Sequence, residues 1–298
     1  MRRWAHRTHL AGLLACIATA CGTGHRAPPS GGITVTDDAG RTITLARPAS
    51  RVVSLLPSFT ELLFAMGAGD RLVGRTAWCD YPPAALSVPN VGDGMPPNIE
   101  AVAARRPDLV VLYRSAQNAP AAAQLERLGI PVVVLDLNQL TDLGHAARIL
   151  GRLTDRKQSA DSLARVMDSA AAQPPAPSTH SLVFIVWDNP PIIIGAGSYL
   201  DRLAALAGAR NVFHDIGSPS AQVSIETIAA RDPDFVAVLS DSATLPSFAA
   251  RPEWRVVRAV RHGRFLLLPG RLFGRPSPRV ARAVRELRNR LNGEGGAP

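Results

Sequence analysis

The chain carries one stretch twice, first as Asn98-Ile-Glu-Ala-Val-Ala-Ala-Arg-Arg-Pro-Asp-Leu-Val-Val-Leu-Tyr113 and again as Ser224-Ile-Glu-Thr-Ile-Ala-Ala-Arg-Asp-Pro-Asp-Phe-Val-Ala-Val-Leu239. The two copies align without a gap, so they form an internal repeat. In each copy an Asn or Ser precedes a short apolar helix, and a proline ends that helix before a β-branched strand. The repeat therefore predicts two similar lobes, each with a helix that leads into a buried strand.

Strands and helices alternate around both copies, which is typical of an α/β fold with mainly parallel sheets. Residues 33–45 read as a leading hairpin, and Ser58 with Glu61 is predicted to form a capping box where the strand over 51–56 turns into a helix. The longest helical stretch runs from Thr141 to about Ala172, with an interruption near Gly151, and suits a connection between the lobes. Further strands are predicted over 72–76, 109–113, 131–137, 182–187 and 265–268.

The first 21 residues have the composition of an export signal, with three arginines, no acidic residue and a short apolar run. Ala18-Thr-Ala-Cys21 resembles a bacterial lipobox, which would make Cys21 a lipidated residue that anchors the chain to a membrane; Cys16 is a rival site. The predicted organisation is a signal over 1–21, a tether over 22–32, an N-terminal lobe over 33–140, a connecting helix over 141–175, a C-terminal lobe over 176–292 and a loose tail over 293–298.

Charge and cysteine content narrow the function classes. The formal net charge is +9, but the arginines are spread along the chain without a basic stripe interleaved with aromatics, so no nucleic-acid partner is expected. The Arg-rich region from Arg251 to Arg290 favours solvated helix faces over a single anion site. If Cys16 is removed and Cys21 is lipidated, Cys79 is alone and no intramolecular disulfide is expected.

Signals for an enzyme are weak. The sequence has no dinucleotide fingerprint, phosphate loop, zinc-protease motif or nucleophile elbow, and its histidines lack metal-ligand spacing. Cys79 is favoured as a small buried thiol over a nucleophile. We therefore predict no catalytic residues, no metal site and no resident cofactor.

The loops that follow the predicted strands form the candidate ligand site, because open α/β sheets bind ligands beyond the carboxyl ends of their strands. These loops contain aromatic residues and paired prolines next to apolar strands, which suits a large, partly apolar ligand. They span residues 57–60, 78–83, 113–118, 188–191 and 270–276.

Glu100 and Glu226 occupy equivalent places in the repeat. A carboxylate in the first turn of a helix complements the helix dipole by up to about 1 kcal/mol, and this explains each glutamate taken singly. A partner with two matching cations is the alternative, because the repeat would place one carboxylate on each lobe. The residues alone leave both interpretations open.

At this point the sequence resembles the class III substrate-binding proteins of bacterial ABC importers, which take cobalamin, ferric siderophores or haem, and it is most similar to the cobalamin-binding branch. The resemblance covers about residues 33 to 292 and rests on 51–67, Cys79-Asp-Tyr-Pro-Pro83, the two repeats, Asn189-Pro-Pro191 and Ser277-Pro-Arg279. It implies two Rossmann-like lobes joined by one long helix, a ligand held between them and little hinge closure. It also implies that Glu100 and Glu226 dock onto arginines of the permease.

The resemblance implies a corrin contact at Trp78 and an aromatic contact at Tyr113, and it keeps the family arginine as Arg275. Elsewhere the chain departs from the pattern: Ile192 replaces a family aromatic, Arg271 replaces an acidic residue, and aromatics are missing near Gly92 to Met95 and at about Ser220. Arg271 and Arg275 together would suit a ligand with carboxylates or phosphate. The predicted ligand contacts are Pro57, Ser58, Phe59, Trp78, Asp80, Tyr81, Tyr113, Pro191, Ile192, Arg271, Phe273 and Arg275.

We therefore expect an exported, lipid-anchored, monomeric protein, in a periplasm or on the outer face of the cytoplasmic membrane. It would capture cobalamin or a related corrinoid between its lobes and deliver it to an ABC permease. A ferric siderophore or haem is the alternative ligand. The rivals from other classes are a chelatase-like enzyme and a scavenging lipoprotein that works without a permease.

Overall fold

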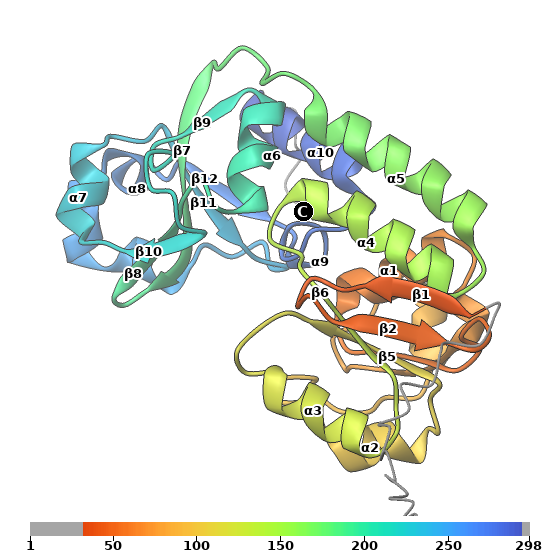
Figure 1. The fold of residues 1–298 in the computed structure, drawn as a ribbon. Coiled ribbons are helices and arrows are strands. Elements are labelled where there is room, and N and C mark those ends of the chain that lie inside the picture. The colour runs from red at the N-terminus through yellow and green to blue at the C-terminus, as the bar shows by residue number, and fades with distance from the viewer. Residues whose placement is uncertain (1–31, 294–298) are drawn as a thin grey trace, which may run out of the picture.

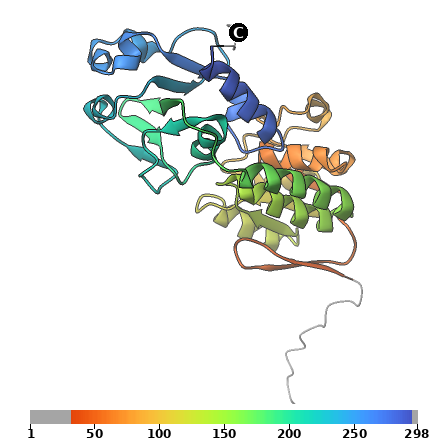
Figure 2. The same cartoon turned by 90° about the horizontal axis from the view of Figure 1, so that it is seen from above.

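The computed structural model describes residues 32–293 and contains two lobes (Figure 1; Figure 2). The predicted signal over 1–21 with Cys21, the tether up to residue 31 and the tail from residue 294 lie outside the described residues.

The N-terminal lobe contains the predicted hairpin, in which β1 (Ile33–Thr36) and β2 (Thr42–Leu45) pair antiparallel. It also contains a four-stranded sheet of order β4-β3-β5-β6 in which every pair is parallel. Its strands are β3 (Val52–Ser54), β4 (Leu72–Arg75), β5 (Leu109–Tyr113) and β6 (Val132–Leu135). All of β3 and β6 is buried, as expected for strands covered on both faces.

The C-terminal lobe is built on a six-stranded mixed sheet of order β10-β8-β7-β11-β12, with β9 also paired to β7. Strands β7, β11, β12 and β9 run parallel, whereas β8 pairs antiparallel with both β7 and β10. The strands are β7 (His180–Asp188), β8 (Pro191–Ile194), β9 (Ala209–Asn211), β10 (Ser220–Gln222), β11 (Phe235–Leu239) and β12 (Phe265–Leu268). The sheets of the molecule are thus mainly parallel, as predicted.

Ten α-helices cover these sheets in the part of the chain that the structure describes. They are α1 (Pro57–Ala65), α2 (Ile99–Ala104), α3 (Ala119–Arg127), α4 (Leu140–Leu153), α5 (Lys157–Ala172), α6 (Tyr199–Ala207), α7 (Ile225–Ala230), α8 (Arg258–Arg261), α9 (Gly270–Phe273) and α10 (Val280–Leu291). Short 3₁₀ helices span Gly69–Arg71, Pro83–Ser87, Ser247–Ala250 and Pro252–Val256. None of the helices described for residues 32–293 has the length and apolarity needed to cross a membrane.

The connecting segment is helical, but it is two packed helices rather than one. α4 ends at Leu153, the chain turns at Asp155, whose φ is 53°, and α5 then runs alongside α4 into the C-terminal lobe (Figure 1). The interruption predicted near Gly151 is present, since α4 ends at Leu153 and α5 begins at Lys157. Gly151 itself lies where the two helices pack closely, because a Cβ there would lie 2.2 Å from the Cβ of Ala160 in α5. α5 alone therefore makes the long link between the lobes.

One hydrophobic core runs through both lobes. Its fully buried residues include Leu109 on β5, Leu150 on α4, Leu203 on α6 and Leu287 on α10. Each leucine buried in this way stabilises the fold by about 1.5–3 kcal/mol relative to an exposed one. Because this core is continuous, changing the angle between the lobes would disrupt packed side chains. Little hinge closure stays a prediction.

The repeat folds in the same way in both lobes. The side chain of Asn98 caps α2 and that of Ser224 caps α7, each by accepting a hydrogen bond from a main-chain N–H in the first turn, at 2.9 and 3.2 Å. The carboxylates of Asp108 and Asp234, at matching positions, each accept a main-chain N–H from the chain entering the neighbouring strand, at 2.8 Å in both lobes. These contacts confirm the two helix starts predicted from the repeat.

Candidate functional site

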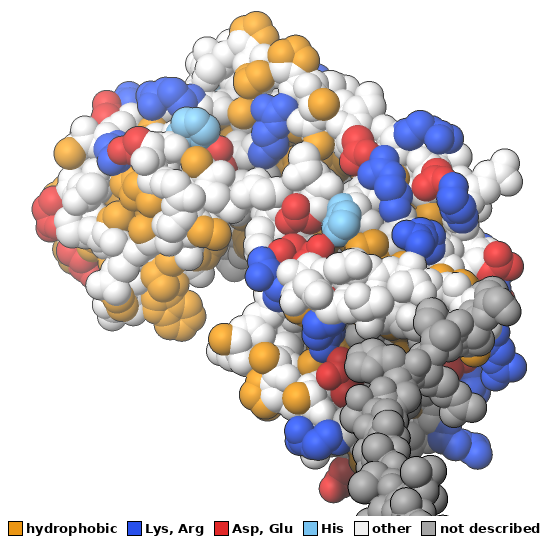
Figure 3. Space-filling view, in the orientation of Figure 1, with side chains coloured by type: hydrophobic (Ala, Val, Ile, Leu, Met, Phe, Trp, Pro, Cys, Tyr) orange, Lys and Arg blue, Asp and Glu red, His pale blue; other side chains and the backbone are white. Residues whose placement is uncertain are grey.

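The candidate site is the space between the two lobes. Figure 3 shows this face of the molecule hollowed between them, with apolar side chains on the C-terminal lobe around the β7–β8 end and on the N-terminal lobe opposite. In the N-terminal lobe, the carboxyl ends of β4 and β5 lead to Trp78 and to the loop after Tyr113. In the C-terminal lobe, β12 leads directly into α9 and the segment up to Arg279, which contacts the N-terminal lobe. Both sheets therefore point their carboxyl ends towards this space.

Trp78 is the largest exposed aromatic of the N-terminal wall, with 64% of its surface accessible. The loop that carries it is held from inside by Arg75, whose buried guanidinium donates to the carbonyls of Ala85 at 2.8 Å and Thr76 at 2.9 Å. The Sγ of Cys79 lies 3.1 Å from the Oγ1 of Thr76 and is fully buried. Trp78 is thus presented on a rigid loop, and Cys79 is the small buried thiol that the sequence favoured.

The loop over Gly92–Pro97 lies against the Trp78 loop. Gly94 has a φ of +84°, and a Cβ there would lie 2.5 Å from the Cγ2 of Thr76, so only glycine allows this approach. Next to it, Met95 is 50% exposed. Met95 is thus an exposed apolar side chain in the loop where the resemblance implies an aromatic residue.

A network of ion pairs joins the lobes behind Trp78. The carboxylate of Glu61, whose side chain is only 2% exposed, accepts hydrogen bonds from Arg275 at 3.0 Å and from Arg279 at 2.7 Å. Arg275 also donates to Asp80 at 2.7 Å, and the guanidinium of Arg279 lies 4.1 Å from the centre of the Tyr81 ring. These contacts cross from the C-terminal lobe to the N-terminal lobe and fix the two walls of the cleft relative to each other.

The electrostatics of this network follow from its geometry. Burial alone would raise the pKa of Asp80, but the hydrogen bond and charge of Arg275 outweigh it and hold that pKa below its ordinary value of 3.8. Burial alone would lower the pKa of Arg275, and the carboxylates of Asp80 and Glu61 raise it instead. Arg275 is therefore a charged residue whose charge is already compensated within the protein.

This arrangement corrects two predictions. Glu61 does not form a capping box with Ser58, because α1 begins at Pro57, its N-cap residue is Leu56 and Ser58 lies within the first turn. Glu61 is bound to the arginines instead, and the buried Oγ of Ser58 has no hydrogen-bond partner in the described structure. Arg271 and Arg275 do not form a free cationic pair either. Arg271 is 75% exposed with its Nε 3.1 Å from Asp80, whereas Arg275 is enclosed between carboxylates.

A second contact between the lobes lies next to Tyr113. The half-buried Tyr113 donates its hydroxyl to the Oδ1 of Asn138 at 2.6 Å. The main-chain carbonyl of Asn138 accepts the N–H of Tyr199 at 3.1 Å, and Gln139 donates to the carbonyl of Gly197 at 2.5 Å. Tyr113 is therefore at the edge of the cleft, where its ring packs against the core that the lobes share.

Several predicted ligand contacts are buried. Ser58, Phe59 and Phe273 are fully enclosed; Phe59 and Phe273 belong to the core that runs through both lobes, so the structure contradicts their assignment as ligand contacts. Phe59 faces the core because it lies on the apolar face of the amphipathic helix α1. Pro57 and Ile192 are half-buried and Pro191 is buried in β8. Trp78, Asp80, Tyr81, Tyr113 and Arg271 are the predicted contacts with surface near the cleft.

The prediction missed an aromatic residue on the C-terminal wall. Trp187 lies at the carboxyl end of β7 and is 59% exposed. It was assigned to the predicted strand over 182–187 and so to the buried sheet. Its position directly before the Asp188-Asn-Pro-Pro191 turn, at the end of a strand that faces the cleft, was the signal that could have identified it.

Glu100 and Glu226 are both exposed, in the first turns of α2 and α7. The hydrogen bonds of its own main chain and of Ser224 lower the pKa of Glu226. Within residues 32–293 neither glutamate forms an ion pair, and α2 and α7 lie at the outer ends of the two lobes (Figure 1). The two carboxylates are thus available to a partner that spans both lobes.

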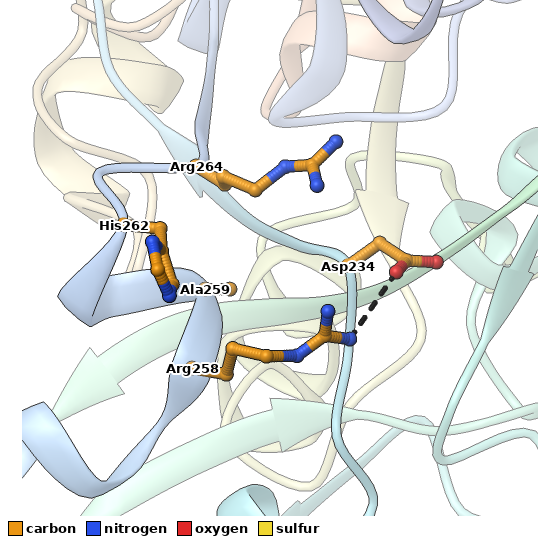
Figure 4. Close-up of a pocket in the computed structure, with 5 residues that line it drawn as sticks. All are labelled: Asp234, Arg258, Ala259, His262 and Arg264. Carbon is orange, nitrogen blue, oxygen red and sulfur yellow. Dashed lines mark hydrogen bonds and ion pairs between the residues drawn. The ribbon is translucent and has the colours of Figure 1, made fainter.

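The Arg-rich region is not one anion site. A cavity of about 230 Å³ lies at the amino ends of β11 and β12. Figure 4 shows the side chains that line it, Asp234, Arg258, Ala259, His262 and Arg264. Arg258 is already 2.7 Å from Asp232 and 3.4 Å from Asp234. Other arginines of the region pair with separate carboxylates, as Arg251 does with Asp188. Among residues 32–293, no three His, Cys, Asp or Glu side chains are grouped to hold a metal ion.

Comparison with known proteins agrees with this geometry. Residues 52–272 match the family model described as periplasmic binding protein. The chain is 29% identical over 266 residues to the ABC transporter substrate-binding lipoprotein YvrC of Bacillus subtilis, covering 86% of this chain and 84% of that protein. It is 30% identical over 247 residues to the vitamin B12-binding protein of Yersinia pestis, covering 81% and 86%.

The solved structure of a periplasmic heme-binding protein from Pseudomonas aeruginosa shares the fold, with a TM-score of 0.71, 24% identity and coverage of 84% of this chain and 95% of that one. The fold class predicted from the repeat is thereby confirmed. With its two lobes, its cleft at the strand ends and a family match over most of its length, this chain belongs to the periplasmic binding protein family.

Proposed function

We propose that this protein is the substrate-binding component of an ABC importer and that it captures cobalamin or a related corrinoid between its two lobes. The observation that carries the proposal is Trp78, which is 64% exposed on the loop that follows the carboxyl end of β4 and that Arg75 holds from inside. An exposed aromatic on a fixed loop suits a large flat ligand, because its face loses little conformational entropy on binding. The relative from Yersinia pestis, which is named for vitamin B12 binding, supports the same ligand class.

The charges around the cleft favour a corrinoid over a strongly anionic chelate. An anionic ligand would need cations that are not already compensated, and the charge of Arg275 is shared between Glu61 and Asp80. To free Arg275 for a ligand carboxylate would remove one of the two arginines that bind the nearly fully buried Glu61, and it would also take from Asp80 its shortest ion pair, so it is unfavourable. Arg271 is 75% exposed and shares Asp80 with Arg275, so it can still contact the single phosphate of a cobalamin nucleotide loop.

Haem or a ferric siderophore is the second candidate, because the exposed guanidinium of Arg271 is also suited to a ligand carboxylate. The similarity to the heme-binding protein from Pseudomonas aeruginosa shows a shared fold and does not indicate which ligand this chain binds. The two candidates differ in charge, so they differ in their dependence on Arg271. Replacement of Arg271 by Gln would weaken an anionic chelate strongly and a corrinoid only modestly.

Delivery would proceed through Glu100 and Glu226, which offer one exposed carboxylate on each lobe to arginines of the permease. Each helix packs on the hydrophobic cluster of its own lobe, through Val102 of α2 and Ile228 of α7, so each carboxylate would have a fixed place on its lobe for a permease to recognise. A lipid anchor at Cys21 would hold the protein at the outer face of a membrane, as a monomer. The lipoprotein relative from Bacillus subtilis supports this location.

The import role is tested by uptake of labelled cyanocobalamin in a strain of the source bacterium from which this gene is deleted. Uptake at nanomolar ligand is expected to fall to background and to return when the gene is supplied in trans. Normal uptake in the deletion strain, together with lost uptake of a ferric siderophore or haem, would replace the corrinoid by the second candidate. Unchanged uptake of all three ligands would overturn the import role.

A further inference from the structure

We propose that Trp187 is a specificity-determining ligand contact that forms the aromatic wall of the C-terminal lobe, opposite Trp78. This inference rests on the proposed function, because it assigns a second ligand-contacting surface to the same cleft. Trp187 is 59% exposed although it lies in a strand whose first two thirds are buried. An exposed tryptophan of this kind is uncommon outside interaction sites, because its large apolar surface is more stable when it is covered.

The sheet register places Trp187 on the cleft edge. β7 pairs parallel with β11, and β11 pairs parallel with β12, so their carboxyl ends lie on one edge of the sheet. From this edge β12 continues into the segment that carries Arg275 and Arg279 to Glu61 of the N-terminal lobe. The carboxyl end of β7, with Trp187, therefore borders the same space between the lobes.

The register also relates Trp187 to a predicted ligand contact. In the antiparallel pair of β7 and β8, Trp187 lies directly opposite Ile192, so the two side chains are on the same face of the hairpin. The register shifts between Ile185 and Trp187, and this bulge leaves both Val186 and Trp187 exposed. The indole therefore covers the face on which Ile192 presents only a half-buried aliphatic side chain.

The indole is held in place, and its polar atom is already satisfied. Its Nε1 donates to the carbonyl of Asn189 at 2.7 Å, and Arg251 anchors the same turn by its contact with the carboxylate of Asp188. Because the N–H is occupied within the turn, the surface left for a partner is the apolar ring. The occupant that fits is the flat face of a macrocycle, contacted by Trp78 from one lobe and by Trp187 from the other.

The experiment is a calorimetric titration of the purified protein with cyanocobalamin, haemin and a ferric hydroxamate siderophore, followed by the same titration of variants with the ligand that binds. Trp187→Ala is expected to raise Kd about 10- to 100-fold, as expected for losing the contact of one large aromatic side chain. Trp187→Phe is expected to retain most of the affinity. The matched control is Val166→Ala, at a site on α5 that is 66% exposed.

The double variant Trp187→Ala with Ile192→Trp separates a ligand contact from a purely structural role. It returns an aromatic ring to the same face of the hairpin from the opposite strand, and it is expected to recover at least part of the lost affinity. Unchanged Kd in Trp187→Ala, or a loss that Ile192→Trp does not recover at all, would overturn the inference while the proposed function stands. If the parent protein binds none of the three ligands, the proposed function fails and this inference fails with it.

Discussion

The guanidinium of Arg275, on the C-terminal lobe, lies 2.7 Å from the carboxylate of Asp80, on the N-terminal lobe, and 3.0 Å from that of Glu61. One arginine therefore ties two carboxylates of the opposite lobe together at the back of the cleft. This contact joins the two lobes in addition to the hydrophobic core that they share.

Glu61 should be the most important member of this network for stability. Glu61→Gln removes the charge that compensates Arg275 and Arg279, both of which are mostly enclosed. We expect the free energy of unfolding to fall by about 3–5 kcal/mol, because Arg275 keeps Asp80 but the mostly enclosed Arg279 loses the carboxylate that it pairs with. Chemical denaturation of the purified protein measures this change.

The matched control is Glu126→Gln, which removes a carboxylate that is 44% exposed and paired with Arg41. We expect this change to cost less than about 1 kcal/mol, as is usual for exposed ion pairs. Equal effects of the two substitutions would mean that the inter-lobe network has no special role.

Asp80 should make stability depend on pH. Its folded-state pKa is lowered, so its contribution to stability is present above the ordinary value of 3.8 and is lost as the pH falls through the lower folded value. The free energy of unfolding of the parent should therefore decrease on acidification below about pH 4–5, and Asp80→Asn should show a shallower decrease over the same window. Denaturation at a series of pH values tests this; parallel profiles for both proteins would be evidence against the pairing with Arg275.

Trp78 should contribute to affinity and not to folding. Trp78→Ala removes a side chain that is 64% exposed, so we expect the unfolding midpoint to change little. Affinity for cyanocobalamin should fall about 10- to 100-fold, and Trp78→Phe should retain part of it. Calorimetry and thermal unfolding on the same samples separate the two effects. A large loss of stability with unchanged affinity would mean that Trp78 stabilises the fold and does not contact the ligand.

Glu100 and Glu226 should act only in delivery. The double variant Glu100→Ala with Glu226→Ala is expected to abolish uptake of cyanocobalamin by cells and to leave Kd within about twofold, because both side chains are exposed on the outer helices. The control Asp70→Ala with Glu253→Ala removes the same net charge from two other exposed positions, which are 71% and 52% exposed. If affinity is lost as well, the two glutamates belong to the ligand site or to the fold; if the control variant loses uptake equally, net charge and not position is responsible.

The repeat was sufficient to predict the two-lobed α/β fold, because capping at Asn98 and Ser224 and the Pro–Asp turns are local features that sequence spacing determines. Long-range contacts were not predictable in the same way. Glu61 has the spacing of a capping box, but arginines more than 200 residues away bind it instead. Local spacing is a weak guide where a buried ion pair competes for the same carboxylate.

The site was predicted in part. The resemblance implied a ligand contact at Trp78, and this side chain is 64% exposed; its contact with a ligand stays a prediction. Phe59 and Phe273 were predicted to contact the ligand because they lie in loops that follow strands. Both side chains are instead buried in the hydrophobic core. Trp187 was missed because strand residues are usually buried, and only the register with Ile192 shows that it shares a face with a predicted contact.

The most direct test of the central claim is a parallel equilibrium titration of the purified protein with cyanocobalamin, haemin and a ferric siderophore. The structure predicts saturable 1:1 binding of cyanocobalamin that is at least about tenfold tighter than that of the two other ligands, with a loss of affinity in Trp78→Ala. Tight binding of haemin or the siderophore with no binding of cyanocobalamin, or binding of cyanocobalamin that is unaffected by Trp78→Ala, would contradict a corrinoid site built on the aromatic walls of this cleft.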